Sequence, residues 1–321
     1  MILASYPKAL REEIHVALAC NDAYAYYCAE TIVSLLLNSV GENLFYRFYI
    51  VQRNLLEENK RRIAKLRDTV GDCTIEFIEM GEGGPGAFRD PMYYRLKLAS
   101  LLPDLDRVIY TDCDVTFLTS LGDLWHEDID AYYSGNCIDF GRDRDLILDH
   151  FSRVCGVSGD DFPLSSHEVY FNSGFMLMNL AKIRDDGVEG RVEACLEKYP
   201  NLLYGDQDVI NLVYQGKIKP ISFRWSFLIS YYTAKRSRIK IKDPRLLADL
   251  EDSAKYPRMV HFLADKKPDT IYRSIFHIPS YWIVNGYKKI FWEYVAHTDW
   301  KGEKTYRLVY RFPLNFLNRR A

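Results

Sequence analysis

Two acidic side chains stand one residue apart at the end of an apolar run. The run is Val108–Tyr110, and the carboxylates belong to Asp112 and Asp114. In an extended segment, side chains two residues apart point to the same side. Neighbouring carboxylates repel unless a proton or a cation bridges them, and their hard oxygen atoms suit Mg²⁺ or Mn²⁺. The pattern favours a divalent metal that holds a diphosphate, although two turn residues after a strand would give the same letters.

A second enzyme class uses a similar pattern. DCDVT, residues 112–116, matches the DxDx[TV] of haloacid-dehalogenase-type phosphatases, in which the first aspartate is a nucleophile. In that class the pattern normally lies on the first strand of its domain, whereas about a hundred residues precede it here. Asp160 and Asp161 would have to supply the second acidic pair, and they follow a loop-like stretch rather than a strand. A phosphatase is therefore kept as an alternative.

Alternating strand and helix patterns precede the two aspartates. The predicted strands are residues 14–20, 44–51, 73–80 and 108–115, and the predicted helices are residues 26–38, 54–70 (with Asn54 as the N-cap) and 93–103. This alternation is typical of a parallel sheet with crossover helices. Ligands of such sheets bind beyond the carboxyl ends of the strands, where the two aspartates are expected.

The second half of the chain has a mixed pattern. It predicts strands at residues 131–139 and 170–180, helices at 142–157 and 205–216, and a strand pair within 217–228. The strand at 170–180 is interrupted by Asn172, Ser173 and Gly174. Polar groups inside a buried strand need hydrogen-bond partners, so this interruption favours a functional role.

The composition excludes several other classes. The 321 residues carry a net charge of -2, which gives no support to nucleic-acid binding. Seven cysteines without a CxxC pair favour a reducing compartment over a disulfide framework or a zinc ribbon. The amino-terminal stretch has no signal-peptide pattern, and no apolar run approaches the roughly 20 residues of a membrane span. We therefore expect a cytoplasmic protein.

Six stretches, taken in order, resemble the retaining glycosyltransferases of family 8. They are NDAY (21–24), RLKL (95–98), TDCDV (111–115), YFNSGFMLMNL (170–180), GDQDVIN (205–211) and HFLADKKP (261–268). The family includes bacterial lipopolysaccharide galactosyl- and glucosyltransferases, and glycogenin is a relative. The resemblance implies an α/β nucleotide-sugar-binding fold of the GT-A type, with a mostly parallel central sheet flanked by helices. It also implies a UDP-hexose donor, Mn²⁺ or Mg²⁺, and retention of anomeric configuration.

The resemblance assigns metal and donor roles to particular residues. The implied metal ligands are Asp112, Asp114 and His261, and the implied donor-binding residues are Asn21, Tyr24, Arg95, Asp112, Asn172, Ser173 and Lys267. Tyr24 would stack on the base, and Asn21 stands where many relatives have an aspartate that meets uracil. Lys267 would offset diphosphate charge. Each also has an ordinary structural alternative, such as a core histidine or a surface lysine.

The catalytic roles come from the same resemblance. Asp206 resembles a carboxylate that holds donor-sugar hydroxyls, although it could equally cap a helix. Gln207 resembles the residue beside the anomeric carbon, and Asp139 resembles an acceptor-side carboxylate. An amide oxygen is a poor nucleophile, so the resemblance favours a front-side substitution through an oxocarbenium-like state. The implied acceptor is a glycan or a lipid-linked saccharide, in lipopolysaccharide or other cell-surface polysaccharide synthesis.

Two residues depart from the family pattern, and the last residues of the chain have a distinctive composition. Ala264 and Asp269 stand where relatives often have glycine and tryptophan, which motivates an alternative: an inactive nucleotide-sugar-binding protein. We expect a catalytic domain at residues 1–270 and a helical, basic and aromatic extension at 271–321. Residues 301–321 carry six basic side chains against one acidic. Such a tail favours peripheral contact with the inner face of the cell membrane.

Overall fold

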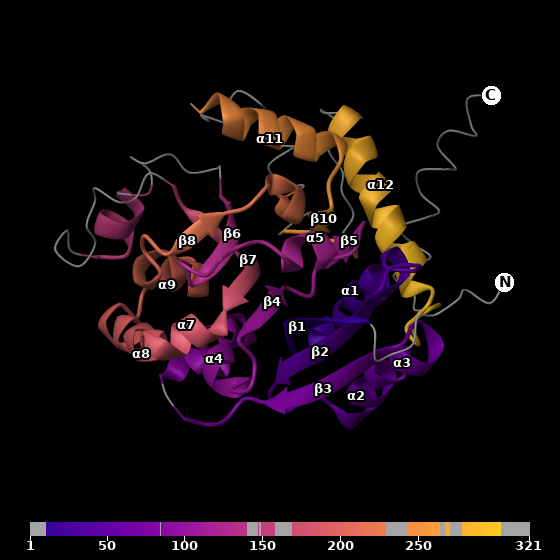
Figure 1. Ribbon diagram of the computed structural model, residues 1–321, viewed down its shortest axis with the longest axis horizontal. Helices are drawn as coiled ribbons and strands as arrows, with labels where there is room; N and C mark the ends of the chain where they lie inside the picture. The colour runs from indigo at the N-terminus through magenta and orange to yellow at the C-terminus, as the bar shows by residue number, and fades with distance from the viewer. Residues whose placement is uncertain are drawn as a thin grey trace.

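The computed structural model describes residues 11–83, 85–139, 147, 149–157, 169–228, 243–263, 267–269 and 278–302, with the backbone alone for 278–283. Its centre is a seven-stranded sheet in the order β3-β2-β1-β4-β7-β6-β8 (Figure 1). The strands are β1 (Glu12–Cys20), β2 (Leu44–Gln52), β3 (Cys73–Glu79), β4 (Arg107–Thr111), β6 (Ser134–Ile138), β7 (Phe171–Asn179) and β8 (Ile218–Pro220). Only β7 among these seven runs antiparallel to its neighbours, so the predicted, mostly parallel sheet is confirmed.

A second, three-stranded sheet lies beside the first. It consists of β5 (Val115–Phe117), β10 (Met259–His261) and β9 (Phe227–Leu228), in the order β5-β10-β9. The predicted strand at residues 108–115 is therefore wrong in one respect, because it divides between two sheets: β4 ends at Thr111 and β5 begins at Val115. The predicted strand pair within 217–228 is also wrong. Strands β8 and β9 belong to different sheets, with a 3₁₀ turn, η7 (Phe223–Ser226), between them.

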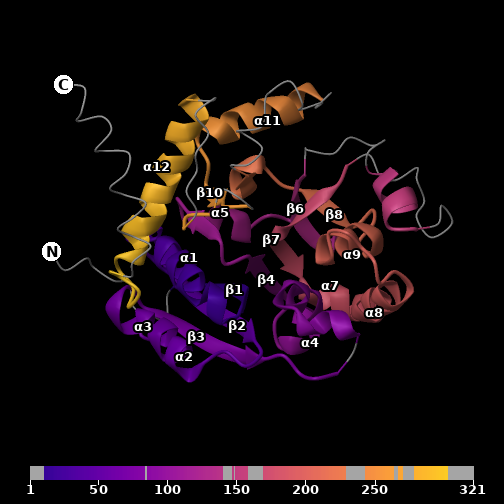
Figure 2. The same cartoon turned by 180° about the vertical axis from the view of Figure 1, so that it is seen from behind.

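Helices cover both faces of the large sheet (Figures 1 and 2). The helical elements in the first part of the chain are η2 (Asp22–Tyr24), α1 (Ala25–Asn38), α2 (Glu57–Ala64), α3 (Leu66–Thr69), η3 (Gly86–Arg89), η4 (Pro91–Lys97), α4 (Leu98–Leu101) and α5 (Gly122–Trp125). The later ones are η5 (His150–Val154), α7 (Leu180–Asp185), α8 (Val188–Lys198), α9 (Asp206–Val213), α11 (Pro244–Lys255) and α12 (Ile278–Val295). Strand β1 shows the two faces. Ile14, Val16 and Leu18 pack in the core with α1 and α12, whereas Ala17 packs in the core with α4, α7 and α8.

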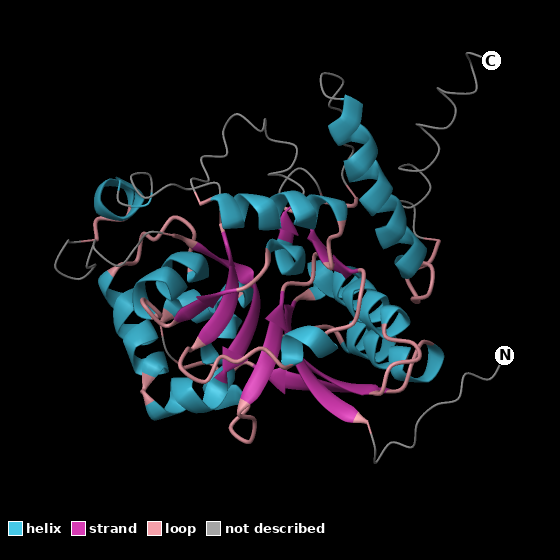
Figure 3. Cartoon of the chain, turned by 45° about the horizontal axis from the view of Figure 1, so that its top comes forward, coloured by secondary structure: helices cyan, strands magenta, loops and turns pink. Residues whose placement is uncertain are grey.

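Two predicted helices differ from the structure. The helix expected at residues 54–70 begins at Glu57, because Asn54 adopts a left-handed conformation with φ of 60°. Asn54 is therefore not the N-cap, and the Asp22 carboxylate accepts a hydrogen bond from the Leu56 amide instead. The helix expected at 93–103 divides between the 3₁₀ element η4, which Pro91 begins, and the short helix α4. Figure 3 shows these helices against the sheet. No helix within the described ranges combines the length and hydropathy that a bilayer crossing needs.

Candidate functional site

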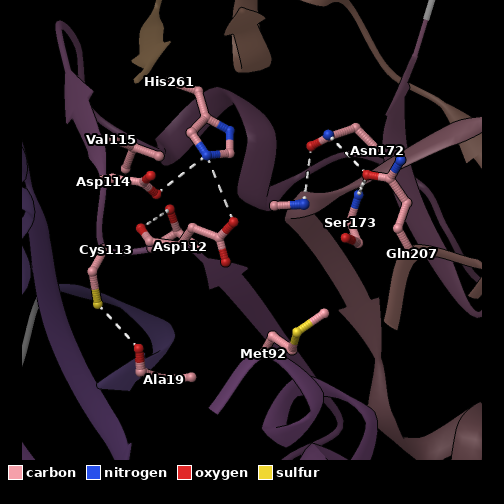
Figure 4. A network of polar contacts seen from close by, with 12 residues as sticks. Ala19, Met92, Asp112, Cys113, Asp114, Val115, Asn172, Ser173, Gln207 and His261 are labelled. Atoms are coloured by element: carbon pink, nitrogen blue, oxygen red, sulfur yellow. Dashed lines mark hydrogen bonds and ion pairs between the residues drawn. The ribbon is translucent and has the colours of Figure 1, made fainter. Parts of the chain in front are cut away.

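The two aspartates lie where the chain leaves the large sheet for the small one (Figure 4). The Asp112 amide donates to the carbonyl oxygen of Gly174 at 2.8 Å, and the Phe262 amide donates to that of Asp114 at 2.9 Å. The Thr31 hydroxyl, from α1, bridges the carbonyl oxygens on either side of Asp114, at Cys113 and Val115. This turn is therefore held by β7, by the segment after β10 and by α1 together.

The small sheet brings His261 to the aspartates. His261 pairs in register with Val115, immediately after Asp114. Its Nε2 atom lies 3.3 Å from Asp114 Oδ1 and 3.6 Å from Asp112 Oδ2. Its side chain is buried, and within the described part of the chain neither ring nitrogen makes a hydrogen bond. One imidazole nitrogen and two carboxylates, whose ligand atoms all lie within 4.8 Å of one another, fit Mn²⁺ or Mg²⁺.

The charges of this group support one another. Burial acts to lower the pKa of His261, but the carboxylates of Asp114 and Asp112 outweigh it and raise that pKa. Burial acts to raise the pKa of Asp114, but His261 and Lys267 outweigh it and lower that pKa. These shifts favour an ionised Asp114 beside a protonated His261, which must lose its proton before it can bind a metal ion.

Arg95 connects this group to a second set of polar residues. Its Nη2 donates to Asp112 Oδ1 at 2.6 Å, and its Nη1 donates to the carbonyl oxygen of Ser173 at 2.6 Å. Its Nε lies 3.1 Å from Asp206 Oδ2. The guanidinium also stacks 4.3 Å from the centre of the Tyr110 ring. Burial acts to lower the pKa of Arg95, but Asp112 and Asp206 hold it above its usual range.

We predict that Arg95→Met costs about 3–5 kcal/mol in the free energy of unfolding, because it leaves the buried Asp206 carboxylate and the partly exposed Asp112 carboxylate without their cation. Urea unfolding in EDTA measures this. Arg107→Met is the matched control, since its side chain is 26% exposed against 5% for Arg95 and its carboxylate partner, Asp130, is exposed. We expect the control to lose about 1 kcal/mol or less. Equal losses in the two variants would contradict this view of Arg95.

A cavity of about 300 Å³ extends from Asp112, Asp114 and His261 to the end of β1. Its walls include Asn21, Tyr24, Arg95, Asp112, Asp114 and His261. The Asn21 side chain caps η2 by accepting a hydrogen bond from the Tyr24 amide at 3.2 Å. Lys267 donates a hydrogen bond to the Tyr24 hydroxyl, and its Nζ lies 3.6 Å from Asp114 Oδ2. The structure thus brings together seven of the residues singled out from the sequence, six in the cavity wall and Lys267 beside it.

The remaining candidates form a second cluster around Gln207. The amide oxygen of Gln207 accepts hydrogen bonds from Asn172 Nδ2 at 3.0 Å and from the Ser173 amide at 3.2 Å. Its Nε2 donates to Asp139 Oδ2 at 3.3 Å. Asp206 is the first residue of α9 and is buried, and burial raises its pKa to about 6. The polar interruption predicted in strand β7 is therefore satisfied by the start of α9.

Sequence reasoning assigned no role of their own to two glycines that this geometry requires, Gly174 and Gly205. A Cβ atom on Gly174 would lie 2.5 Å from His261 Cε1 and 2.7 Å from Asp112 Oδ2. Gly205, directly before Asp206, has φ of 51°, and a Cβ there would collide with Met92. A glycine inside an apolar strand signals close approach of another group, so Gly174 could have been found from the sequence. Nothing in the sequence indicated the stacking of Tyr110 on Arg95.

Of the two residues that depart from the family pattern, Asp269 lies within the described part of the chain. Asp269 is half-buried and accepts a hydrogen bond from the Tyr27 hydroxyl at 2.7 Å. Its charge is therefore engaged by α1. Ala264 lies outside the described residues, as do Asp160, Asp161 and the tail from residue 303 onward.

The chain is similar in sequence to known proteins. The family model described as glycosyl transferase family 8 matches residues 15–268. A putative glycosyltransferase of Haemophilus influenzae is 28% identical over 228 residues, which cover 67% of this chain and 64% of that protein. General stress protein A of Bacillus subtilis is 23% identical over 303 residues, covering 90% of this chain and 95% of the relative. The chain thus spans slightly less than two thirds of the length of the first of these relatives.

A solved structure shares the fold. The galactosyltransferase LgtC, in complex with donor and acceptor sugar analogues, superposes with a TM-score of 0.69 at 24% identity. The match covers 92% of this chain and 100% of that one. At this identity the likeness shows the fold, and it agrees with the mixed α/β architecture and mostly parallel sheet described above.

Proposed function

The chain belongs to glycosyl transferase family 8, and we propose that it transfers galactose or glucose from UDP to a glycan or lipid-linked saccharide, with retention of configuration. The observation that carries this proposal is that Asp112, Asp114 and His261 face the same cavity as Asn21 and Tyr24. One end of the cavity suits a divalent ion and the other suits a nucleobase. A nucleoside diphosphate would span the two.

The donor would be held from several sides. Asp112, Asp114 and His261 would hold Mn²⁺ or Mg²⁺, which stabilises the departing diphosphate. Lys267, half-buried between Tyr24 and Asp114, would contribute a further positive charge. The Tyr24 ring would stack on uracil, and Asn21 would hydrogen-bond its edge. These contacts orient the donor for reaction.

The transfer would take place beside the second cluster. The bond from the anomeric carbon to the diphosphate oxygen breaks, and the acceptor oxygen forms its bond on the same face. The acceptor proton passes to the departing diphosphate. The amide oxygen of Gln207 accepts hydrogen bonds from Asn172 and from the Ser173 amide, and its amide nitrogen donates to Asp139. We therefore propose that Gln207 positions Asp139 and also faces the oxocarbenium-like carbon. Asp206 would hold hydroxyl groups of the donor sugar.

The test is donor hydrolysis in the absence of acceptor. UDP release from UDP-glucose and from UDP-galactose would be measured with Mn²⁺, with Mg²⁺ and with EDTA. We expect metal-dependent release from one of the two sugars. No release from either, together with no calorimetric binding of UDP in Mn²⁺, would overturn the proposal.

The two alternatives predict other results. An inactive binding protein would bind UDP with Mn²⁺ and turn over no donor with any acceptor, although the Asp269 charge that motivated this alternative is engaged by Tyr27. A phosphatase would release phosphate from phosphomonoesters and lose that activity in Asp112→Asn. Family membership removes the support for this second alternative, and Asp112 is already bound by Arg95 and the Tyr110 hydroxyl.

We further propose residues 1–270 as the catalytic domain and residues 271–321 as an extension that contacts the inner face of the cell membrane. Helix α12 lies along α1, with Phe291 and Trp292 buried in the shared core (Figure 1). The basic and aromatic residues of 301–321 would then meet anionic lipid. Co-sedimentation of the full chain with anionic but not neutral vesicles tests this contact, and equal behaviour with both would contradict it.

A separate prediction concerns Tyr24. We expect Tyr24→Ala to weaken UDP binding in Mn²⁺ by roughly 10- to 100-fold, because stacking of an aromatic ring on a base contributes about 1–3 kcal/mol. Tyr24→Phe keeps the ring and should lose only a few-fold, through its missing hydrogen bond to Lys267. Isothermal calorimetry measures both. Tyr256→Ala, at a side chain that is 65% exposed, is the control. Equal weakening by the Phe and Ala variants would show that stacking is not the interaction.

A further inference from the structure

Three cysteines converge behind the two aspartates. Cys20 ends β1, Cys28 lies in α1, and Cys113 stands between Asp112 and Asp114. Their sulfur atoms all lie within 4.8 Å of one another, and all three side chains are buried. The cysteines come from three different elements, so the fold, rather than a local sequence motif, brings them together.

This spacing suits a soft metal ion. A tetrahedral Zn²⁺ holds thiolate sulfurs at about 2.3 Å, which places neighbouring sulfurs roughly 3.8 Å apart. Sulfurs that already lie within 4.8 Å of one another could close on such an ion with small side-chain movements. The thiols would lose their protons to solvent on binding, and the metal–sulfur bonds would replace the S–H bonds.

The hydrogen bonds from Cys20 and Cys113 to backbone carbonyls are weak ones, which a metal ion would displace at small cost. Cys20 donates a hydrogen bond to the Asn21 carbonyl oxygen at 3.3 Å, and Cys113 donates to that of Ala19 at 3.2 Å (Figure 4). Thiols are weak donors, so these bonds contribute little. Cys113 also belongs to the wall of the 300 Å³ cavity, so the cluster lies directly behind that wall.

A second buried group has similar ligand spacing but is a less favourable metal site. It consists of His150, Cys155 and Asp208. Asp208 already accepts hydrogen bonds from the Tyr170 hydroxyl at 2.5 Å and from the Tyr204 amide at 2.8 Å. It also lies 2.8 Å from His150 Nε2. A metal ion there would have to break strong hydrogen bonds to a buried carboxylate. The three-cysteine cluster carries no such cost.

We propose that Cys20, Cys28 and Cys113 form a second metal site, which takes a soft divalent ion such as Zn²⁺ or Cd²⁺. The site is distinct from the oxygen and imidazole donors of Asp112, Asp114 and His261. Because Cys113 joins the two aspartates, closing the sulfurs on an ion shifts the turn between the aspartates and weakens Mn²⁺ binding at the first site. The coupling rests on the proposed function, whereas the thiolate site does not.

Titration of the full chain with Cd²⁺, in a phosphine reductant, tests the site. We expect one equivalent of Cd²⁺ to produce the ultraviolet charge-transfer band of metal-bound thiolate. Cys28→Ser and Cys28→Ala should bind Cd²⁺ at least about tenfold more weakly, because a hydroxyl or a methyl group replaces a soft ligand. Cys155→Ser and Asp114→Ala, which alter the other two candidate groups, should keep the band.

A measurement on the unaltered chain guards against variants that do not fold. X-ray absorption of the unaltered chain with one equivalent of Cd²⁺ should show three sulfur neighbours around the ion. Absence of the band, its survival in both Cys28 variants, or its loss in Cys155→Ser would overturn the site. Coupling predicts that one equivalent of Cd²⁺ weakens Mn²⁺ binding several-fold in the unaltered chain but not in Cys28→Ser. An inactive chain that still binds Cd²⁺ at the cysteines would overturn the proposed function alone.

Discussion

Asp114→Ala is expected to slow metal-dependent UDP release at least about a hundredfold. Metal stabilisation of a leaving group contributes several kcal/mol, and each 1.4 kcal/mol or so is a factor of ten in rate. The variant removes one of two carboxylates and leaves His261 with a single charged neighbour at 3.6 Å, Asp112. We therefore expect Mn²⁺ affinity to fall with the rate. Steady-state UDP release and Mn²⁺ binding by electron paramagnetic resonance measure the two effects.

The matched control lies at the other end of the same strand. Asp106 directly precedes β4, its side chain is 90% exposed, and its nearest ion-pair partner is Arg184 at 3.5 Å. Asp106→Ala removes the same charge at a distance from the cavity, so both measurements should stay within about twofold of the unaltered chain. If Asp114→Ala kept its Mn²⁺ dependence while thermal unfolding showed an intact fold, Asp114 would not be a metal ligand.

The alternation of strands and helices in the first half of the chain was predictable because strands 14–20 and 44–51 are mostly buried on both faces, whereas the edge strand 73–80 is partly exposed. Their apolar runs are nearly continuous, as is typical of a parallel sheet with helices on each side. The break after Thr111 was not predictable from such runs. Val115 and Phe117 are as apolar as Val108 and Ile109, and only the pairing of β5 with β10 shows that they belong to another sheet.

The residues of the candidate site were proposed from the sequence, whereas the contacts between them were not. His261 lies far from Asp114 in sequence, and the register of β10 on β5 is what places the imidazole beside the carboxylate. Arg95 was expected near the diphosphate, yet its contacts with Asp112 and Asp206 depend on the 3₁₀ geometry of η4, which periodicity did not indicate. Long-range register and local helix type are tertiary properties, so a sequence pattern constrains them weakly.

Gly174→Ala is expected to disable the proposed metal site without replacing any of its ligands. The new methyl group would lie 2.5 Å from His261 Cε1, so the imidazole must move away from Asp114. Overpacking of this kind costs about 1–3 kcal/mol in the free energy of unfolding, and we expect Mn²⁺ affinity to fall by at least tenfold. Urea unfolding and Mn²⁺ titration measure the two. Gly190→Ala is the control, because a Cβ there meets nothing within 4 Å and alanine favours helix α8 by about 0.5–1 kcal/mol.

A double-mutant cycle separates the collision with His261 from a general defect of strand β7. In a His261→Ala background the imidazole is absent, so Gly174→Ala should cost less in stability than it does alone, by about 1 kcal/mol or more. The Asp112 carboxylate, 2.7 Å from the same Cβ position, would account for the remainder. Additive costs would mean that alanine disturbs the pairing of β7 with β4 rather than the histidine. A clear coupling would mean that the family-8 strand carries its glycine to admit the imidazole against the backbone, where it meets both aspartates.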